Sequence, residues 1–297
     1  MTGMATLGVC AIFKNEAPNL AEWLRFHRLV GVERFYLYNN DSSDDWKQAI
    51  YDSGEVRDVT VIHAPGRERQ VPAYGDCHTR FGPSTRWIAY IDCDEFLFPT
   101  DCGDLRTLLA DYEKHPGLVA NWMMFGSSGY RERPEGLTTQ RYTRRGRSGF
   151  VVGNPVFLRA PGLDPSVSSS YRPMNTHVKT IAQSARAVRP LSPHHFEFRD
   201  GAPAVNESGE PVPIYWSDRI SVERLRINHY WSKSLAELER KTARGYACAG
   251  RGVSQRYASD IERLMNVEID TTIFPLARRL PGWDPMFGAV ARQAASA

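Results

Sequence analysis

Short apolar runs alternate with amphipathic stretches over the first part of the chain. Residues 7–13, 35–38 and 56–62 are apolar runs that predict strands. The helical patterns between them, at 18–31 and 45–52, complete a strand–helix–strand–helix–strand order. This order predicts right-handed βαβ units. We therefore expect an α/β fold with a mostly parallel central sheet flanked by helices.

A fourth apolar run, at residues 87–91, ends in two carboxylates. The run shows no polar alternation, which favours a strand buried on both faces. Asp92 follows it directly and Asp94 comes two residues later, so an extended chain would point both side chains the same way. Two carboxylates at the carboxyl end of a strand suit Mg²⁺ or Mn²⁺, with phosphate oxygens as further ligands. A turn that ends the strand explains the same residues without a metal.

The remaining pattern predicts further helices, strands and loops. They are a helix at 68–80, a helix that begins near Asp101 or Asp104, a strand at 118–125, loops and short strands at 155–213, a strand at 225–228, a helix from Ser234, and two weaker helices with a tail. Ser234 and Glu237 have the spacing of a capping box. His27 lies on the apolar face of the first helix, so we expect a buried, hydrogen-bonded histidine and not a ligand.

Residues 130–151 are polar and basic, with four arginines close together: Arg141, Arg144, Arg145 and Arg147. A solvated face is the usual explanation of such a run. The functional alternative is a mobile loop that neutralises a diphosphate or an acidic acceptor.

Composition narrows the class of protein. The 297 residues carry a formal charge of only +3, so charge alone gives no argument for a nucleic-acid partner. The five cysteines are scattered and form no CxxC pair, which favours a reducing compartment. The pattern of a secretory leader and any apolar run of membrane-spanning length are missing from the sequence. We expect a cytoplasmic protein. Spaced glycines of a dinucleotide site and a phosphate-binding glycine loop are missing too.

An ordered series of short motifs resembles glycosyltransferases of the GT-A (nucleotide-diphospho-sugar transferase) fold, in particular family 92 and related family 2 enzymes. The pieces are Lys14-Asn15-Glu16 with Glu22-Trp23-Leu24 and His27; Tyr38-Asn39-Asn40-Asp41-Ser42; Ile91-Asp92-Cys93-Asp94-Glu95-Phe96; Phe125-Gly126-Ser127-Ser128-Gly129; and His229-Tyr230 with Lys233-Ser234 and Lys241 to Gly245. The series is specific because the pieces occur in the family's order, from about residue 7 to about residue 246.

The resemblance implies a metal-dependent, inverting glycosyltransferase that moves a hexose from a UDP-sugar, or another nucleotide-diphosphate sugar, to a glycan or lipid-linked acceptor hydroxyl. Residues 1–125 would bind the nucleotide-sugar, 126–233 would form the acceptor-side half of the same domain, and 234–297 would be a C-terminal helical segment. A lipid-linked acceptor would bring the protein to the inner face of the membrane as a peripheral protein.

The resemblance also assigns candidate site residues. Asp92 and Asp94 would hold Mn²⁺ or Mg²⁺, and His229, at a strand end before a capped helix, is expected as the third ligand, with His194 or His195 as the alternative. The candidates for binding the nucleotide-sugar are Lys14, Asn15, Glu16, Asn40, Gln70, Asp76, Asp92, His177 and Lys179. An acceptor hydroxyl needs a general base, usually a carboxylate. The candidates are Glu132, Asp200 and Glu197.

Two other functions remain open at this point. A sugar nucleotidyltransferase shares the broad fold, but it normally begins with a glycine-rich phosphate loop, and here the first strand ends in Lys14-Asn15-Glu16. A catalytically inactive relative could use the cleft only to bind a carbohydrate or a nucleotide-sugar. The retention of both Asp92 and Asp94 favours an enzyme.

Overall fold

A computed structural model describes residues 3–101, 103–150, 173–244 and 255–287 of the chain. The helices are α1 Ala17–Leu29, α2 Trp46–Ser53, α3 Gln70–Phe81, α4 Leu105–Ala110, α5 Thr138–Arg141, α6 Leu235–Arg244, α7 Gln255–Leu264 and α8 Phe274–Ala277. The strands are β1 Ala5–Phe13, β2 Arg34–Asn39, β3 Val59–His63, β4 Thr85–Tyr90, β5 Glu95–Pro99, β6 Gly117–Met124, β7 Arg144–Arg145, β8 Val178–Gln183, β9 Ala187–Pro190, β10 Phe196–Phe198, β11 Ala204–Val205, β12 Pro211–Val212, β13 Leu225–His229 and β14 Glu268–Ile269. The predicted helix end at Gly245 lies outside the described residues.

One mixed sheet organises the molecule. Its strand order is β12-β11-β6-β8-β4-β1-β2-β3, and β13 and β5 extend it from β6. β1 pairs in parallel with β2 and β4, and β2 pairs in parallel with β3. β8 runs antiparallel between β4 and β6, so β6 has the same direction as β4. The expected α/β class with a mostly parallel sheet is confirmed.

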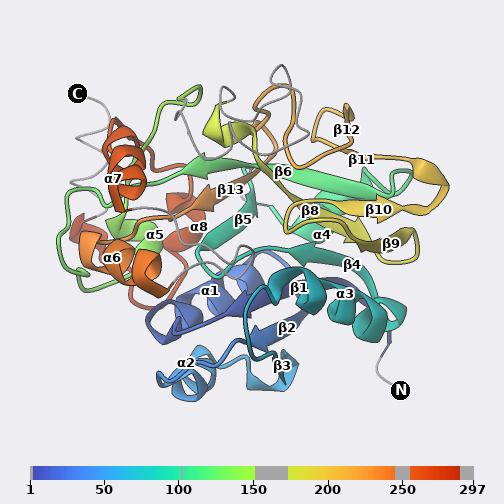
Figure 1. Cartoon of the computed structure of the whole chain (residues 1–297), viewed down its shortest axis with the longest axis horizontal. Helices are drawn as coiled ribbons and strands as arrows, with labels where there is room; N and C mark the ends of the chain where they lie inside the picture. The colour runs from blue at the N-terminus through green and yellow to red at the C-terminus, as the bar shows by residue number, and fades with distance from the viewer. Residues whose placement is uncertain (1–2, 102, 151–172, 245–254, 288–297) are drawn as a thin grey trace.

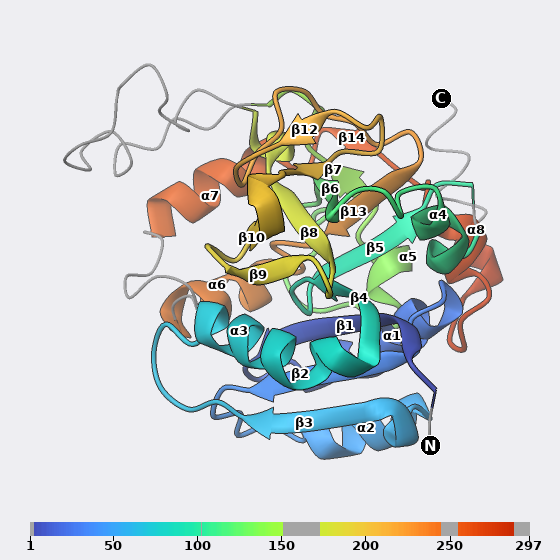
Figure 2. The ribbon, with the colours of Figure 1, turned by 90° about the vertical axis from the view of Figure 1, so that its right-hand side faces the viewer.

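Helices cover both faces of the parallel part of the sheet (Figure 1). Along β1, Leu7, Val9 and Ala11 face the core under α1 and α2, whereas Cys10 and Ile12 face the core under α3. Figure 2 shows α3 on one side of β1 and β2 and α1 on the other. Because both faces are covered, the strands read as continuous apolar runs without alternation.

The first helix is fixed to the sheet by polar groups as well as by apolar packing. The Trp23 indole N–H donates to the carbonyl of Glu95 at 2.8 Å. His27 Nδ1 lies 2.8 Å from the carbonyl of Trp23, and its Nε2 accepts the backbone N–H of Leu97 at 3.2 Å. Burial lowers the pKa of His27 to about 3, so the ring is neutral. The expectation of a buried, hydrogen-bonded histidine is confirmed.

The structure differs from the expected elements around the two carboxylates. β4 ends at Tyr90, and residues 91–94 form a turn, so Asp92 and Asp94 do not share one face of an extended strand. β5, Glu95–Pro99, was not predicted. Its five residues are buried, and it pairs antiparallel with β13 from the distant end of the sequence. Because β13 is distant from β5 in the sequence, no local sequence pattern predicts this pairing.

Other predicted elements are close to those observed. The predicted strand at 56–62 begins instead with a 3-10 turn, Val56–Asp58, before β3. The capping box before α6 is present: the hydroxyl of Ser234 and the carboxylate of Glu237 are 2.8 Å apart, and Glu237 also accepts the N–H of Ser234 at 3.2 Å. α6 therefore begins where the sequence predicts.

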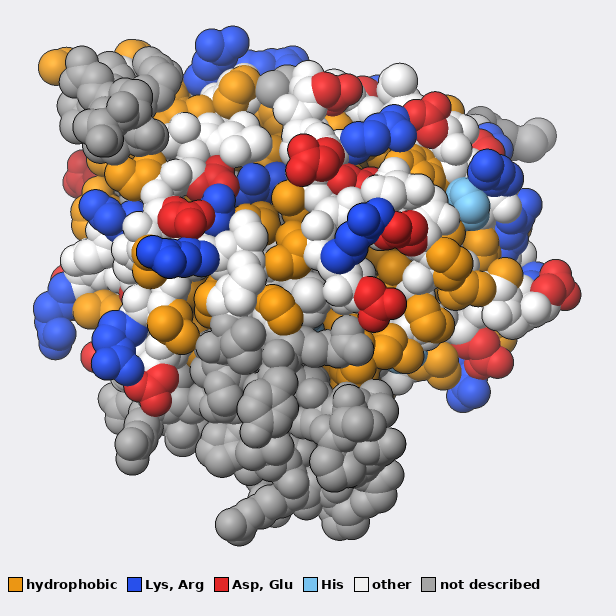
Figure 3. Space-filling model, turned by 90° about the horizontal axis from the view of Figure 1, so that it is seen from above, with side chains coloured by type: hydrophobic (Ala, Val, Ile, Leu, Met, Phe, Trp, Pro, Cys, Tyr) orange, Lys and Arg blue, Asp and Glu red, His pale blue; other side chains and the backbone are white. Residues whose placement is uncertain are grey.

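Charged side chains of both signs are interspersed over the described part of the face shown in Figure 3. No helix in the described part of the chain has both the length and the apolar content that a membrane span requires.

Candidate functional site

Several strand ends meet at one edge of the sheet. β1, β2, β4, β6 and β13 all point their carboxyl ends to this edge, because their pairings run in parallel or through antiparallel β8. β5 begins there, since it is antiparallel to β13. In open α/β sheets the carboxyl edge is where ligands bind. Asp92, Asp94, Lys179 and His229, predicted site residues from distant parts of the sequence, are brought together here.

Asp92 is held by a lysine and a glutamine. The ammonium group of Lys179, on β8, lies 2.8 Å from Asp92 Oδ2. Gln70, the first residue of α3, donates its amide N–H to Asp92 Oδ1 at 2.5 Å. Lys179 is fully buried, whereas the Asp92 side chain is 31% exposed. Three of the predicted nucleotide-sugar residues are therefore in direct contact.

Asp94 is held by a different set of groups. Lys241 of α6 donates to Asp94 Oδ2 at 2.6 Å, and His229 Nε2, at the end of β13, lies 3.5 Å from Asp94 Oδ1. Burial favours the neutral acid, but the charge of Lys241 and the contact with His229 outweigh it and hold the pKa of Asp94 well below its ordinary value. Asp94 is thus an ionised, buried carboxylate.

Glu95 lies beneath both aspartates, fully buried. Its Oε2 accepts the backbone N–H of Asp92 at 2.8 Å and lies 3.7 Å from the ammonium group of Lys179. Its Oε1 lies 3.8 Å from Nδ1 of His229, and neither atom has a hydrogen-bond partner among the described residues. Burial raises the pKa of Glu95 well above its ordinary value, against the opposing charge of Lys179. No local sequence pattern marks Glu95 as a site residue, because Lys179 and His229 come from distant parts of the chain.

Glu16 anchors a second part of the cluster. Lys233 donates to its Oε2 at 2.9 Å, and Arg244 donates to its Oε1 at 2.7 Å. Burial alone would raise the pKa of Glu16, but Lys233 and Arg244 lower it to about 2. The cluster therefore contains four basic side chains, of Lys179, Lys233, Lys241 and Arg244, against buried acids. Lys241 and Arg244 are three residues apart on α6, a spacing that puts both on one face.

Asn40 and Asp76, both predicted to bind the nucleotide, form hydrogen bonds to other groups of the protein. The side-chain amide of Asn40 donates to the carbonyls of Ala64 and Gly66 at 2.7 and 2.8 Å, which joins the ends of β2 and β3. Asp76, on α3, accepts the hydroxyl of Tyr38 at 2.7 Å and pairs with Arg80 at 2.8 Å. The amide donors of Asn40 are thus used within the protein.

The turn after β1 carries the remaining early candidates. Asn15 has a positive φ of 54°, accepts the N–H of Ser43 at 2.8 Å on its side chain, and donates its own N–H to the hydroxyl of Ser42 at 3.0 Å. The backbone carbonyl of Lys14 accepts a hydrogen bond from Arg244. These contacts connect the turn after β1 to the turn after β2 and to α6.

His177 lies in an aromatic cluster beside the acidic residues. Its ring stacks on Trp122 of β6, with centroids 5.3 Å apart, and the Trp122 ring also meets His229 edge to face at 4.5 Å. His194 contacts the same Trp122 ring at 5.2 Å. Burial lowers the pKa of both His177 and His194, so these imidazoles are neutral near pH 7.

The three candidate bases lie outside the contacts described above. Glu197, on β10, pairs with Arg189 of β9 at 2.6 Å at the surface. Asp200 has a positive φ of 62° and lines a surface hollow with Lys114 and His115, next to the start of β6 and so at the opposite edge of the sheet. Glu132 is exposed in the loop that precedes α5. The positions of Glu197 and Asp200 do not support them as the base.

The arginines of the basic stretch form ion pairs within the protein. Arg145 pairs with Asp270 at 2.7 Å and with Glu268 at 2.6 Å, and Arg141 pairs with Asp284 at 3.4 Å. These contacts connect the loop after β6 to the C-terminal part of the chain. Arg141 and Arg145, with side chains only 18% and 16% exposed, are therefore ion-pair partners within the protein and do not lie on a solvated face.

The fit of the site to a divalent cation can be tested on Asp94 and His229. His229 Nε2 and Asp94 Oδ1 are both buried and face each other, and the unpartnered His229 Nδ1 faces the unpartnered Glu95 Oε1. Histidine ligands usually donate their second N–H to a carboxylate in this way. Within the described residues, no group of three or more His, Cys, Asp or Glu side chains is arranged to hold a metal ion. Asp94 and His229 thus fit as two ligands, while both oxygens of Asp92 have other partners.

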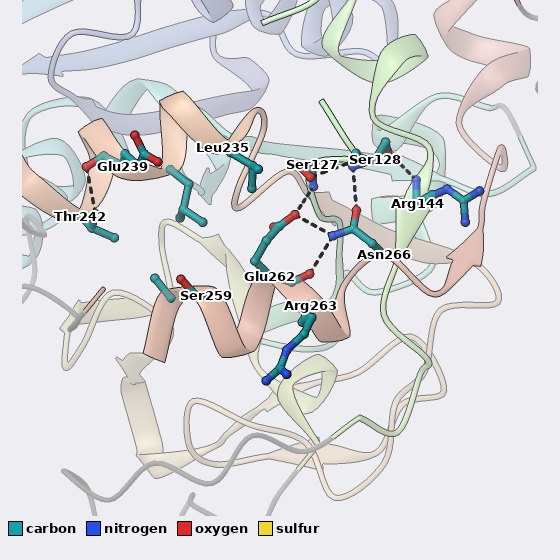
Figure 4. Close-up of a pocket in the computed structure, with 13 residues that line it drawn as sticks. Ser127, Ser128, Arg144, Leu235, Glu239, Thr242, Ser259, Glu262, Arg263 and Asn266 are labelled. Carbon is teal, nitrogen blue, oxygen red and sulfur yellow. Dashed lines mark hydrogen bonds between the residues drawn. The ribbon is translucent and has the colours of Figure 1, made fainter. Parts of the chain in front are cut away.

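A separate cavity of about 550 Å³ lies between α6, α7 and the loop after β6 (Figure 4). Glu262 organises its floor by accepting the N–H of Ser127 at 2.9 Å and the side-chain amide of Asn266 at 2.6 Å. Leu235 and Leu238 of α6 supply apolar lining. None of the predicted site residues is among the residues that line this cavity.

Acidic and basic side chains thus converge at the carboxyl edge of an α/β sheet, the edge at which proteins of this class bind their ligands. Residues 5–145 match the model of glycosyltransferase family 92. A family 92 protein of Oryza sativa subsp. japonica is 31% identical over 226 residues, which are 75% of this chain and 32% of that protein. One of Arabidopsis thaliana is 30% identical over 151 residues, which are 47% of this chain and 26% of that protein. The chain belongs to glycosyltransferase family 92.

The chain spans about a third of the length of the Oryza sativa relative and about a quarter of the length of the Arabidopsis thaliana relative. Among solved structures, Staphylococcus aureus TarS residues 1–349 in complex with UDP matches at a TM-score of 0.33 and 12% identity, over 61% of this chain and 47% of that one. Glucosyl-3-phosphoglycerate synthase of Mycobacterium tuberculosis with Mn²⁺, UDP and glucosyl-3-phosphoglycerate matches at 0.32 and 16%, over 61% and 57%.

Proposed function

We propose that this chain transfers a hexose from a nucleotide-diphosphate sugar, with UDP-sugars as the first candidates, to an acceptor hydroxyl with inversion at the anomeric carbon. One observation carries the proposal. At the carboxyl edge of the sheet, Lys179 and Lys241 pair with the two aspartates of an Asp-x-Asp turn. Lys233 and Arg244 pair with Glu16, the third acid of the cluster. Membership of family 92 supports the same activity.

The basic residues have a role in the departure of the nucleoside diphosphate. Negative charge grows on the leaving diphosphate as the glycosidic bond breaks, and nearby cations stabilise it. Lys179 and Lys241 are ion-paired to Asp92 and Asp94 in the structure. On donor binding, each ammonium group would exchange a carboxylate for a phosphate oxygen. The two lysines would then neutralise part of the diphosphate charge, and the carboxylates that they release would be available to a divalent cation.

A divalent cation, Mn²⁺ in preference to Mg²⁺, would be held by Asp94 and His229. When bound, it would supply charge neutralisation and orientation of the donor diphosphate. Imidazole suits Mn²⁺ better than Mg²⁺. Glu95 would fix the His229 ring through Nδ1, from which it is 3.8 Å away. Asp92, with Lys179 released, is the third candidate ligand.

The nucleoside would lie along the ends of β1 and β2. Gln70 and Asp76 are both on α3, and Gln70 already contacts Asp92, so the ribose is expected between this helix and the turn. The rigid turns of Lys14, Asn15 and Asn40 would shape the base pocket through their backbone. Glu132 is the remaining carboxylate candidate for the base, because Glu197 and Asp200 face other surfaces.

The decisive experiment is a panel of UDP- and GDP-sugars assayed for hydrolysis and transfer with Mn²⁺ present and after chelation. Asp94→Asn should remove most activity, since a neutral amide binds a divalent cation weakly, and should leave the fold intact. Asp101→Asn is the matched control: this exposed aspartate only accepts the N–H of Gly103, and asparagine can do the same. Unchanged turnover of a folded Asp94→Asn protein would refute the proposal.

The same panel separates the alternatives. Donor binding without hydrolysis or transfer would indicate a binding protein, and pyrophosphate-dependent formation of nucleoside triphosphate would indicate a nucleotidyltransferase. The cytoplasm remains the proposed compartment, with a peripheral position at the inner membrane face for a lipid-linked acceptor. Sedimentation of the protein with membrane vesicles, washed with high salt, tests that position.

A further inference from the structure

An aromatic surface adjoins the candidate donor site on its β8 side. It is formed by the rings of Trp122, His177, His194 and Tyr215, and we call it the aromatic platform. Tyr215 lies 6.2 Å from His177 and 6.3 Å from His194 between ring centroids, and Trp122 contacts both histidines. His177, His194 and Tyr215 are partly exposed, so a ligand can reach them.

The platform is joined to the donor site at two points. The Trp122 ring meets the ring of His229, which contacts Asp94. His177 and Lys179 are two residues apart on extended chain and therefore point to the same side of the sheet. Lys179 contacts Asp92. A molecule on the platform would thus lie beside the groups proposed to hold the donor diphosphate.

The polar atoms of the platform offer both acceptors and a donor. Nδ1 of His177 lies 3.0 Å from the carbonyl of Met174, and Nδ1 of His194 lies 3.0 Å from the carbonyl of Val178. A carbonyl can only accept, so each neutral ring carries its proton on Nδ1 and keeps Nε2 as an acceptor. The indole N–H of Trp122, in a side chain more than nine-tenths buried, has no hydrogen-bond partner in the part of the chain that the structure describes.

We propose that the aromatic platform binds a pyranose ring of the acceptor. A pyranose has an apolar face of C–H groups and a rim of hydroxyls. Aromatic rings match the face, and a few fixed donors and acceptors match the rim. The proposal rests on the proposed function, because it assigns the acceptor of that same site. It names a sugar hydroxyl, in place of a protein or nucleic-acid group, as the acceptor.

The test uses direct binding, which does not depend on turnover. Saturation-transfer NMR and titration are carried out with the methyl α- and β-pyranosides of glucose, galactose and mannose and with cellobiose. At least one probe should bind the wild-type chain. Tyr215→Ala should weaken it about tenfold or more through loss of ring contact, and Tyr215→Phe should retain it. The Kd for UDP should stay within about twofold in both variants.

Tyr51→Ala is the matched control, because Tyr51 is a largely exposed tyrosine on α2. It should change neither probe nor UDP binding. Equal probe binding by wild type and folded Tyr215→Ala would overturn the proposal, as would no binding of any probe. Thr242→Trp fills the cavity between α6 and α7. If this variant loses probe binding while Tyr215→Ala retains it, the acceptor binds in that cavity and the proposal is overturned. UDP binding without sugar turnover would instead refute the proposed function and leave the probe result interpretable.

Discussion

Lys241 Nζ lies 2.6 Å from Asp94 Oδ2, across 147 residues of sequence. The second carboxylate of the Asp-x-Asp turn is therefore already neutralised by a cation of the protein itself. Any divalent cation must compete with this ammonium group, which is also near the proposed position of the donor diphosphate. A metal ion that binds Asp94 must therefore displace the ammonium group of Lys241.

Replacement of Lys241 by methionine should strengthen metal binding and weaken catalysis. Without the competing ammonium group, Mn²⁺ should bind the donor-free protein about tenfold more tightly, measured by calorimetry. Turnover should fall, because a cation is lost from the leaving group. Arg240→Met, at the exposed neighbouring position on α6, is the control for both measurements. Weaker or unchanged Mn²⁺ binding in Lys241→Met would show that the lysine and the metal do not share Asp94.

His229→Ala should raise the Mn²⁺ concentration needed for half-maximal activity by more than about tenfold, equivalent to about 1.4 kcal/mol of binding. The physical reason is loss of the one imidazole that faces Asp94, at 3.5 Å. A metal titration at saturating donor measures it. The matched variant is His195→Ala, whose ring contacts Tyr215 and Ser192. If only His195→Ala shifts the metal requirement, the ligand assignment moves away from His229.

Glu16 should make folding stability depend on acid pH. Its pKa is lowered from 4.5 to about 2, so the folded state binds the proton less readily than the unfolded state. The contribution to stability is present above pH 4.5 and is lost as pH falls toward 2. Between pH 6 and pH 3 the loss amounts to about 2 kcal/mol.

Urea unfolding at both pH values, compared with Glu16→Gln, measures this contribution. The variant should be less stable at pH 6 and should lose less stability on acidification. Glu113→Gln, which removes a carboxylate paired with Arg86 near the surface, is the control. Parallel pH dependence of wild type and Glu16→Gln would contradict the assigned ion pairs with Lys233 and Arg244.

Asn40→Asp should destabilise the fold. The asparagine donates two hydrogen bonds to the carbonyls of Ala64 and Gly66, and a carboxylate would face both carbonyls without a donor. The cost should be at least about 2 kcal/mol near neutral pH, in urea unfolding. Asn39→Asp should be much milder, since the side chain of Asn39 accepts the N–H of Ser42 at 2.9 Å and aspartate can also accept. Equal stability of the two variants would show that the Asn40 bonds contribute little.

Much of the parallel half of the fold follows from the sequence. Residues 7–13, 35–38 and 87–91 lie on β1, β2 and β4 almost to the residue, because a strand covered on both faces must be apolar throughout. The capping box at Ser234 and the buried state of His27 are equally local, since each depends on residues three or four positions apart. The Asp-x-Asp turn and its place at the sheet edge follow from where an apolar run ends.

The tertiary structure decided which charges meet at that edge. Lys179, Lys241 and Arg244 reach Asp92, Asp94 and Glu16 from β8 and α6, and no spacing along the chain encodes these distances. β5 and the role of Glu95 became visible only through the antiparallel pairing with β13. Glu197 and Asp200 are carboxylates and therefore plausible bases. Residue type alone, however, does not determine on which surface of the protein a side chain lies. Ionic contacts and strand pairing join residues that are far apart in the sequence, so they depend on the tertiary fold. Apolar runs and helix caps depend on residues that are close together in the sequence.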